Sequence, residues 1–187
     1  MNQRELVERA RGGDHDAFAL LAGVSVARLE AIARLILQDP ELARDAVQEA
    51  YIRAWRDLPG LRDPDRFDAW LRRLTINACL DASRRRRRRP IEVEIGTIEP
   101  AQAGDMTVLL ANRDLIEHAF AGLEPTQRAV LVLHFYADLT MPAVAETLGV
   151  PLGTAQSRLG RALAAMRRAI DTGDANDVQA ERRGQYA

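Results

Sequence analysis

Apolar residues recur at three- and four-residue spacing along most of this chain, and strand-like alternation is rare. The pattern runs from Asn2 to about Arg89 and returns from Asn112 to Ile170. This spacing places apolar side chains on one face of an α-helix. We therefore predict an all-α protein of two small helical domains, because a stretch without the pattern separates the two periodic ones.

The intervening stretch differs in charge as well as in periodicity. Residues 90–111 contain acids but no basic residue, which is typical of an extended acidic linker. The end of the chain, 171–187, is polar and weakly periodic, and we expect it to be a disordered tail. The predicted division is a first domain at 1–89, a flexible linker at 90–111, a second domain at 112–170 and the tail. The linker acids are Glu92, Glu94, Glu99 and Asp105.

Helix-starting and helix-stopping residues set the limits of the predicted helices in the first domain. Gly12 and Gly13 interrupt the pattern, Asp14 and Asp39 are good N-caps, and Pro40 suits a first helical turn. Pro59 and Gly60 end a helix, and Pro90 stops another. The predicted helices are about 4–11, 14–21, 26–37 and 40–58, followed by a long helix that begins near residue 65.

Composition excludes several classes of protein. The 187 residues are 47% apolar and 28% charged with a net charge of −1, which is ordinary for a water-soluble globular protein. The longest apolar runs are far too short to cross a bilayer, so we expect a cytoplasmic protein without membrane insertion.

The single cysteine, Cys79, has no partner for an intramolecular disulfide and is expected in the core. The scattered histidines and the lack of a phosphate loop predict no metal, no cofactor and no enzyme activity.

Positive charge is concentrated in one part of the first domain. All basic residues of the chain are arginines, and residues 66–89 carry nine of them against only Asp68 and Asp81. A patch of this kind suits phosphate groups, although an arginine run is also common on a merely solvated surface.

Residues 140–168 have the layout of a helix-turn-helix. A short helix, 142–148, is followed by a turn at 149–153 and a longer helix from Thr154. Thr140 is the expected cap, and Gly149 allows a left-handed turn. The second helix carries four arginines and no acid as far as Ile170, which favours DNA, although a helical hairpin with a solvated basic face has the same pattern. We expect its inward face to be Ala155, Leu159, Ala162, Leu163 and Met166.

Several sequence blocks resemble the extracytoplasmic-function (ECF) sigma factors of the sigma-70 family of RNA polymerase subunits. The family's region two resembles LVER at 6–9, DAF at 16–18, DAVQEAYIRAW at 45–55 and FDAWLRRLTIN at 67–77. Region four resembles LT at 139–140 and PLGTAQSRLGRA at 151–162. The blocks cover most of the chain in the family's order.

The resemblance implies a function and a set of sites. Region two of the family binds core RNA polymerase and captures a flipped base of the melted -10 element, and region four reads the -35 element as duplex. The implied -10 residues are Leu61, Arg62, Asp63, Arg66, Arg72, Arg73, Asn77, Arg84 and Arg85. The implied -35 residues are Thr154, Gln156, Ser157, Arg158, Gly160 and Arg161. The implied polymerase-binding residues are Asp45, Gln48, Glu49, Arg53 and Trp55.

The implied partners are core RNA polymerase, through the clamp helices of its largest subunit and the flap of its second-largest subunit, promoter DNA, and an anti-sigma factor. The alternative is a stand-alone helix-turn-helix regulator, which would leave the block at 45–77 unexplained. The acidic linker is expected either to mask the basic surfaces in the free protein or to occupy the nucleic-acid channel of the polymerase.

The recognition helix departs from the family at two positions. Gln156 stands where the family usually has a basic residue, and Gly160 where it often has a larger one. Since glutamine prefers adenine edges and arginine prefers guanine, the -35 sequence is expected to differ from the family's common one.

Overall fold

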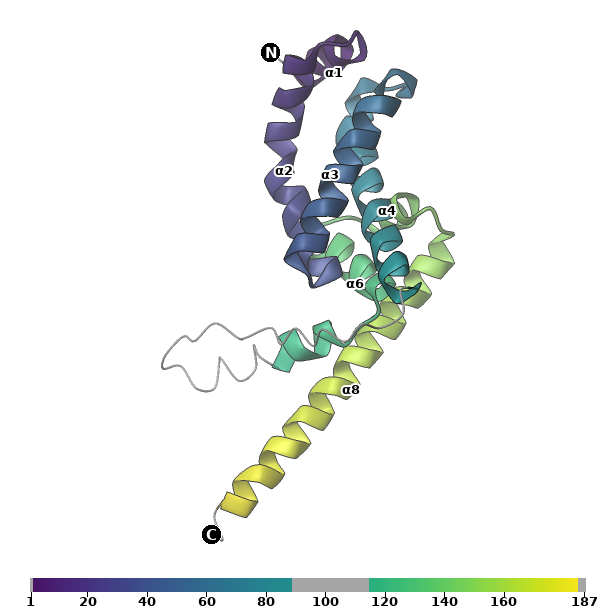
Figure 1. Ribbon diagram of the computed structural model, residues 1–187. Helices are drawn as coiled ribbons and strands as arrows, with labels where there is room; N and C mark the ends of the chain where they lie inside the picture. The colour runs from purple at the N-terminus through teal and green to yellow at the C-terminus, as the bar shows by residue number, and fades with distance from the viewer. Residues whose placement is uncertain (1, 89–114, 185–187) are drawn as a thin grey trace.

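The computed structural model describes residues 2–88 and 115–184, with side chains as far as residue 172. Every regular element in these two ranges is a helix, which confirms the prediction of an all-α protein. Figure 1 shows a bundle formed by the first part of the chain and a long helix that extends away from it. The acidic linker predicted at 90–111 lies outside the described residues, as does the end of the chain from residue 185.

The first part contains four helices: α1 (Gln3–Arg11), α2 (His15–Leu37), α3 (Pro40–Asp57) and α4 (Phe67–Arg88). The Asp14 side chain caps α2 by accepting a hydrogen bond from the Ala17 amide at 3.0 Å. Asp39 caps α3 in the same way, with the Leu42 amide at 2.9 Å. These aspartates satisfy amides that the first turn of a helix leaves without partners, so the helices begin where their sequence signals lie.

Helix α2 is longer than the sequence predicted. It runs without a break through residues 22–25, where the prediction separated two helices. Gly23 lowers helix propensity, but tertiary contacts compensate. The Ser25 hydroxyl donates to the Leu21 carbonyl at 3.0 Å and lies 2.8 Å from the hydroxyl of Tyr51 on α3.

Two short 3₁₀ turns connect α3 to α4: η1 (Leu58–Gly60) and η2 (Pro64–Arg66). The Asp63 side chain accepts from the Asp65 amide at 3.1 Å, which fixes the start of η2. Asp65 in turn forms an ion pair with Arg4 of α1. The loop that the sequence analysis assigned to -10 recognition is therefore held against the first helix.

The second part begins with a helix at 115–121 and continues with α6 (Pro125–Leu131) and the π-helical segment η3 (Val132–Tyr136). The helix-turn-helix follows as α7 (Met141–Leu148) and α8 (Leu152–Gly184). Gly149 has φ 64°, the left-handed conformation that the sequence predicted for the turn. Thr140 occupies the N-cap position of α7, but its side chain makes no capping hydrogen bond, so that detail of the prediction is wrong.

Helix α8 extends well beyond the helix-turn-helix. It continues to Gly184, through residues that the sequence analysis assigned to a disordered tail. The stretch from 171 contains several alanines and no proline, so weak apolar periodicity does not prevent a helix there. The apolar face of α8 also differs from the prediction at one position: Ala155 and Ala162 are buried, whereas Leu163 is exposed.

Buried side chains from both parts form one continuous core. Leu29, Ile36 and Phe67 of the first part belong to the same cluster as Val130 and Val144 of the second. Cys79 is fully buried, as predicted for a small core residue. Within the part of the chain that the structure describes, no helix is both long and apolar enough to span a bilayer.

Candidate nucleic-acid interface

A hollow of about 360 Å³ opens beside the loop between α3 and α4. Four predicted -10 residues of the loop, Leu61, Arg62, Asp63 and Arg66, line it together with Arg72 and Arg73 of α4. The structure thus brings these six residues to one site. Their arginines give the hollow a basic wall, which suits the phosphates of a nucleic-acid strand.

Arg72 is the most constrained cation of this hollow. Its side chain is half-buried, and among the described residues its Nε has no hydrogen-bond partner. Burial lowers the pKa of the Arg72 guanidinium, and the nearby positive charge of Arg28 adds to the effect. A buried donor without a partner is costly, so Arg72 holds its place in the wall of the hollow at the expense of stability.

Trp70 is a residue of this site that the sequence analysis missed. It lines the hollow beside Arg72, whereas its spacing from Phe67 and Leu74 would place it only on the apolar face of α4. Its ring centroid lies 6.1 Å from that of the buried Phe67, which holds the indole in place. An aromatic side chain beside a basic wall can stack on a nucleic-acid base. In the sequence, the FDAWL block at 67–71 was the feature that could have identified Trp70 as a site residue.

The loop is anchored electrostatically. The Arg4 guanidinium donates to the Asp65 carboxylate, and this hydrogen bond lowers the pKa of Asp65. Because Asp65 belongs to η2, the pair links the position of Arg66 to α1.

Asn77 does not lie in this hollow, although the sequence analysis grouped it with the loop. It lines a separate hollow with Arg53, Asp81 and Arg84 of the first part and with Arg158 of α8. Asn77 lies one turn of α4 beyond Arg73, about 6 Å further along the helix axis, and this turn faces the next hollow. The loop at 61–66 therefore lies before the start of α4, whereas Asn77 lies near the middle of that helix.

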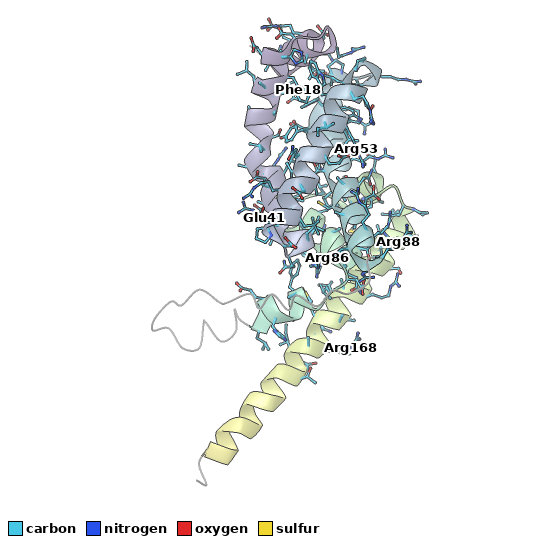
Figure 2. The ribbon with its side chains drawn as sticks, viewed as in Figure 1. Phe18, Glu41, Arg53, Arg86, Arg88 and Arg168 are labelled. Carbon is cyan, nitrogen blue, oxygen red and sulfur yellow. The ribbon has the colours of Figure 1, made fainter. Side chains whose placement is uncertain are left out.

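The arginine run forms the end of α4, where Figure 2 labels Arg86 and Arg88. Basic residues suit the last turn of a helix because its carbonyl end carries partial negative charge. Three of the arginines are paired with acids: Arg84 with Asp81 at 3.1 Å, Arg86 with Asp39 at 3.1 Å, and Arg87 with Glu124 of the second part. Arg85, predicted for -10 binding, is exposed in the same run.

Helix α8 presents most of the predicted -35 residues to solvent. Gln156, Ser157, Gly160 and Arg161 are exposed, and Thr154 is half-buried. The Arg161 Nη2 donates to the Ser157 hydroxyl at 3.2 Å, which holds the guanidinium along the helix surface. Arg158 is also half-buried and lines the hollow that contains Asn77.

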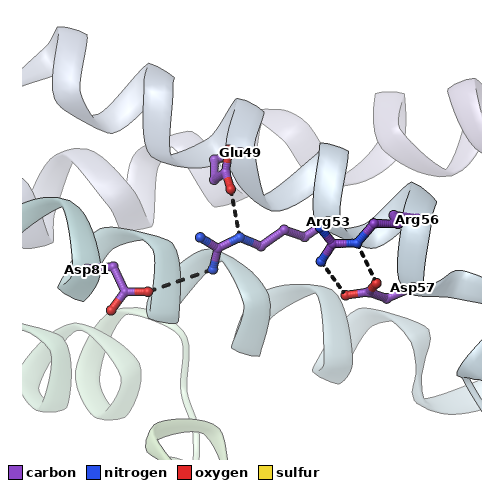
Figure 3. Close-up of polar contacts among 5 residues, drawn as sticks. All are labelled: Glu49, Arg53, Arg56, Asp57 and Asp81. Atoms are coloured by element: carbon purple, nitrogen blue, oxygen red, sulfur yellow. Dashed lines mark hydrogen bonds and ion pairs between the residues drawn. The ribbon is translucent and has the colours of Figure 1, made fainter.

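The predicted polymerase-binding residues lie on α3. Asp45 and Gln48 are exposed. The Arg53 Nε donates a hydrogen bond to the Glu49 Oε1 at 2.8 Å. The Arg53 Nη1 forms an ion pair with the Asp81 Oδ2 of α4 at 3.7 Å (Figure 3).

Trp55, the last predicted polymerase-binding residue, is half-buried and packs against α2. Its ring stacks on His15 with centroids 4.4 Å apart and meets Phe18 at 5.1 Å. The side chain therefore joins α3 to the start of α2. Among the described residues there is no cluster of side chains suited to a metal ion.

Comparison with known proteins agrees with this arrangement. Residues 25–89 match the family described as Sigma-70 region 2, and residues 113–166 match the family described as Sigma-70, region 4. The RNA polymerase sigma-E factor of Streptomyces avermitilis is 33% identical over 150 residues, which cover 80% of this chain and 83% of that protein. The ECF RNA polymerase sigma factor SigM of Mycobacterium tuberculosis is 31% identical over 166 residues, 89% of this chain and 83% of that protein.

A solved structure shares the fold. CnrH, in complex with the cytosolic domain of CnrY, superposes with a TM-score of 0.63 and 26% identity, over 91% of this chain and 97% of that chain. The two region matches flank residues 90–111. Together with sigma factors that match over most of their own length, they leave the stand-alone regulator without support. The chain belongs to the ECF RNA polymerase sigma factors of the sigma-70 family.

Proposed function

We propose that this sigma factor divides promoter recognition between its two parts. The loop at 61–66 and α4 capture the melted -10 strand, and α8 reads the -35 duplex from the major groove. The observation that carries the proposal is the basic hollow with Trp70 beside Arg72, because an extruded base needs both a stacking surface and a cationic track for its backbone.

The four exposed -35 residues on α8 support the second half of the division. These residues lie near the start of α8, which follows a short helix and a left-handed turn. In a helix-turn-helix, this geometry places the start of the second helix against base edges. Asn77 is proposed to contact the displaced strand further along α4 than the base-capturing loop.

The exposed face of α3 around Asp45 and Gln48 is proposed to bind the clamp helices of the polymerase. The second part is proposed to bind the flap of the second-largest subunit. Binding to core polymerase would take place in the cytoplasm, and the sigma factor itself would carry out no covalent chemistry. The domain limits of 1–89 and 112–170 are proposed on the same basis, with the acidic linker between them.

An anti-sigma factor is proposed as the inhibitory partner. CnrH, the sigma factor whose fold this chain shares, is solved with the cytosolic domain of CnrY. A partner that covers α3 or the loop hollow would compete directly with polymerase or promoter DNA.

The docking face is tested by measuring the affinity of labelled protein for core polymerase. Gln48→Arg should weaken binding, because it places charge and bulk on an exposed position at the centre of the face. Ala27→Arg is the matched control, since Ala27 is exposed on a different helix, α2, and the substitution adds the same single charge. Equal affinity of both variants would place the polymerase surface elsewhere, and no binding by the wild type would refute the proposed function.

A further inference from the structure

We propose that the hollow lined by Asn77, hereafter the Asn77 hollow, is a binding site for a small organic phosphate. It measures about 350 Å³, which is within the range of small-molecule sites. Its lining combines charged and polar side chains with a few apolar ones. The charged and polar residues are Arg53, Asn77, Asp81, Arg84, Thr126 and Arg158.

The charges of this lining favour an anion. Three arginines against the single carboxylate of Asp81 leave a net charge of +2. The Arg84 Nη1 lies 3.1 Å from the Asp81 Oδ1, and the Arg53 Nη1 lies 3.7 Å from the Asp81 Oδ2, so two guanidinium groups share one carboxylate. Glu49, outside the lining, holds the Arg53 guanidinium in place through Nε. A phosphate monoester carries about −1.5 to −2 charges at neutral pH, which would balance the lining.

Two half-buried side chains of the Asn77 hollow have no partner within the part of the chain that the structure describes. These are Arg158 of α8 and Asn77 of α4, which form neither an ion pair nor a hydrogen bond there. Partial burial removes some of their contact with water, so an acceptor placed in the hollow would satisfy both. Phosphate suits this role, because the fork of an arginine matches two of its oxygens.

The apolar residues of the hollow favour an organic phosphate over a bare phosphate ion. They are Leu80 of α4, Leu148 at the end of α7 and Val150 in the turn before α8. These side chains offer no hydrogen bond to an ion, whereas an apolar group beside the phosphate would bury surface against them. A mononucleotide has both parts, a phosphate for the arginines and a nucleoside for the apolar residues.

The α6 side of the hollow is fixed in the free protein. Thr126 lies in the first turn of α6, two residues before Arg128. The Arg128 side chain is only 5% exposed, and its Nε donates to the Ile36 carbonyl at 2.6 Å. Its Nη1 donates to the Ala121 and Leu123 carbonyls at 2.9 and 2.6 Å. Because this wall is already ordered, a ligand would lose less free energy in ordering its site.

The site connects the ligand to promoter recognition. Asn77 and Arg84 are proposed to contact the -10 strand, and Arg158 is predicted to contact the -35 element. A bound phosphate would therefore compete with DNA for all three side chains. This consequence rests on the proposed function, whereas the site itself rests on the lining of the hollow.

The site is tested by isothermal titration calorimetry of the full chain, with adenosine monophosphate (AMP) as the probe. AMP should bind at one site, and Arg158→Gln should weaken this binding at least about tenfold, because a charge-assisted hydrogen bond is lost. Arg167→Gln removes the same charge from an exposed position of α8 outside the hollow and should leave the affinity for AMP unchanged. A wild type that does not bind AMP, or an equal loss in both variants, would overturn the proposal.

A second pair of variants tests the site without changing an arginine. Thr126→Glu places a carboxylate in the hollow, and an acid suits the first turn of α6. It should bind AMP at least about tenfold more weakly than Thr126→Gln, which has the same size and no charge. Equal affinity of these two variants would show that the anion binds elsewhere and would also overturn the proposal.

The ligand class is tested with the two halves of the probe. Adenosine, which lacks the phosphate, should not bind, and inorganic phosphate should bind more weakly than AMP. Either of them binding as tightly as AMP would overturn the proposed class. A protein that directs promoter-specific transcription but does not bind AMP would refute the site alone. A protein that binds AMP as expected but directs no such transcription would refute the proposed function and leave the site intact.

Discussion

Arg161 and Gly160 are adjacent residues on the exposed side of α8, and they raise different questions about recognition. Arg161 is tied to Ser157 in the free protein, so its guanidinium is partly ordered before DNA arrives. Gly160 has open space around it, since an added Cβ would meet no heavy atom within 4 Å. No packing constraint within the described protein requires a glycine there.

Replacement of Arg161 by alanine should weaken promoter binding by about 1–3 kcal/mol and relax the base preference at one -35 position, because a bidentate base contact would be lost. The measurement is holoenzyme binding to a library of -35 variants. Arg167→Ala, an exposed arginine further along α8, is the control and should weaken binding without changing preference. Unchanged affinity and preference for Arg161→Ala would remove this residue from the interface.

Gly160→Ala should raise the free energy of unfolding by about 1 kcal/mol, because alanine favours the helix and its methyl group meets no neighbour. Urea denaturation measures this change. If the helix lies close to DNA at this position, the same variant should weaken -35 binding despite its greater stability. Unchanged or tighter binding would indicate that the glycine has no role in close approach.

Individual elements show which features local sequence determines and which depend on tertiary contacts. The limits of α1, α3 and α7 agree with their predicted starts and stops, because caps, prolines and glycines act within one turn. The continuity of α2 was not predictable, since the Ser25 and Tyr51 hydroxyls that meet beside Gly23 are far apart in sequence. The separation of Asn77 from the loop follows from its place near the middle of α4, one turn beyond Arg73.

The cap of α2 predicts a pH dependence. A hydrogen bond from the Ala17 amide, reinforced by Arg9, lowers the pKa of Asp14 below its ordinary value. A lowered pKa in the folded state means that this contribution is complete above the unfolded pKa of about 3.9 and is lost as pH falls through the folded value.

The stability advantage of wild type over Asp14→Asn should therefore be largest at neutral pH and shrink as the solution is acidified below about pH 4. Urea denaturation across this range measures it, with Asp16→Asn, an exposed neighbour, as the control for the loss of one charge. A difference that does not change with pH would show that the charge of Asp14 contributes nothing to the cap.

At the scale of the whole molecule, the two parts share one core, a feature for which the sequence has no periodic signal. Val130 and Leu133 have the spacing of one face of a helix, but this spacing does not reveal that their surroundings include α2. The burial of Arg128 could not be predicted from the sequence either, because its three carbonyl partners belong to turns and helix ends that are separated along the chain. The hollow beside the loop at 61–66 likewise depends on the folded arrangement of both parts, since residues of α7 complete its wall.

Arg128→Met should lower the free energy of unfolding by about 2–3 kcal/mol, because it keeps the apolar stem but leaves buried carbonyls without donors. Chemical denaturation is the measurement, and Arg167→Met on the exposed side of α8 is the control. A change no larger than that of the control would mean that water replaces the guanidinium at little cost.

The central claim is that this chain turns core RNA polymerase into a promoter-specific enzyme. Run-off transcription with purified protein, core polymerase and a pool of genomic promoter fragments tests it most directly. We predict transcripts that start at defined positions downstream of a shared pair of sequence elements and that disappear when the protein is left out. Transcription from core polymerase that starts without preference, whether or not the protein is added, would contradict the account.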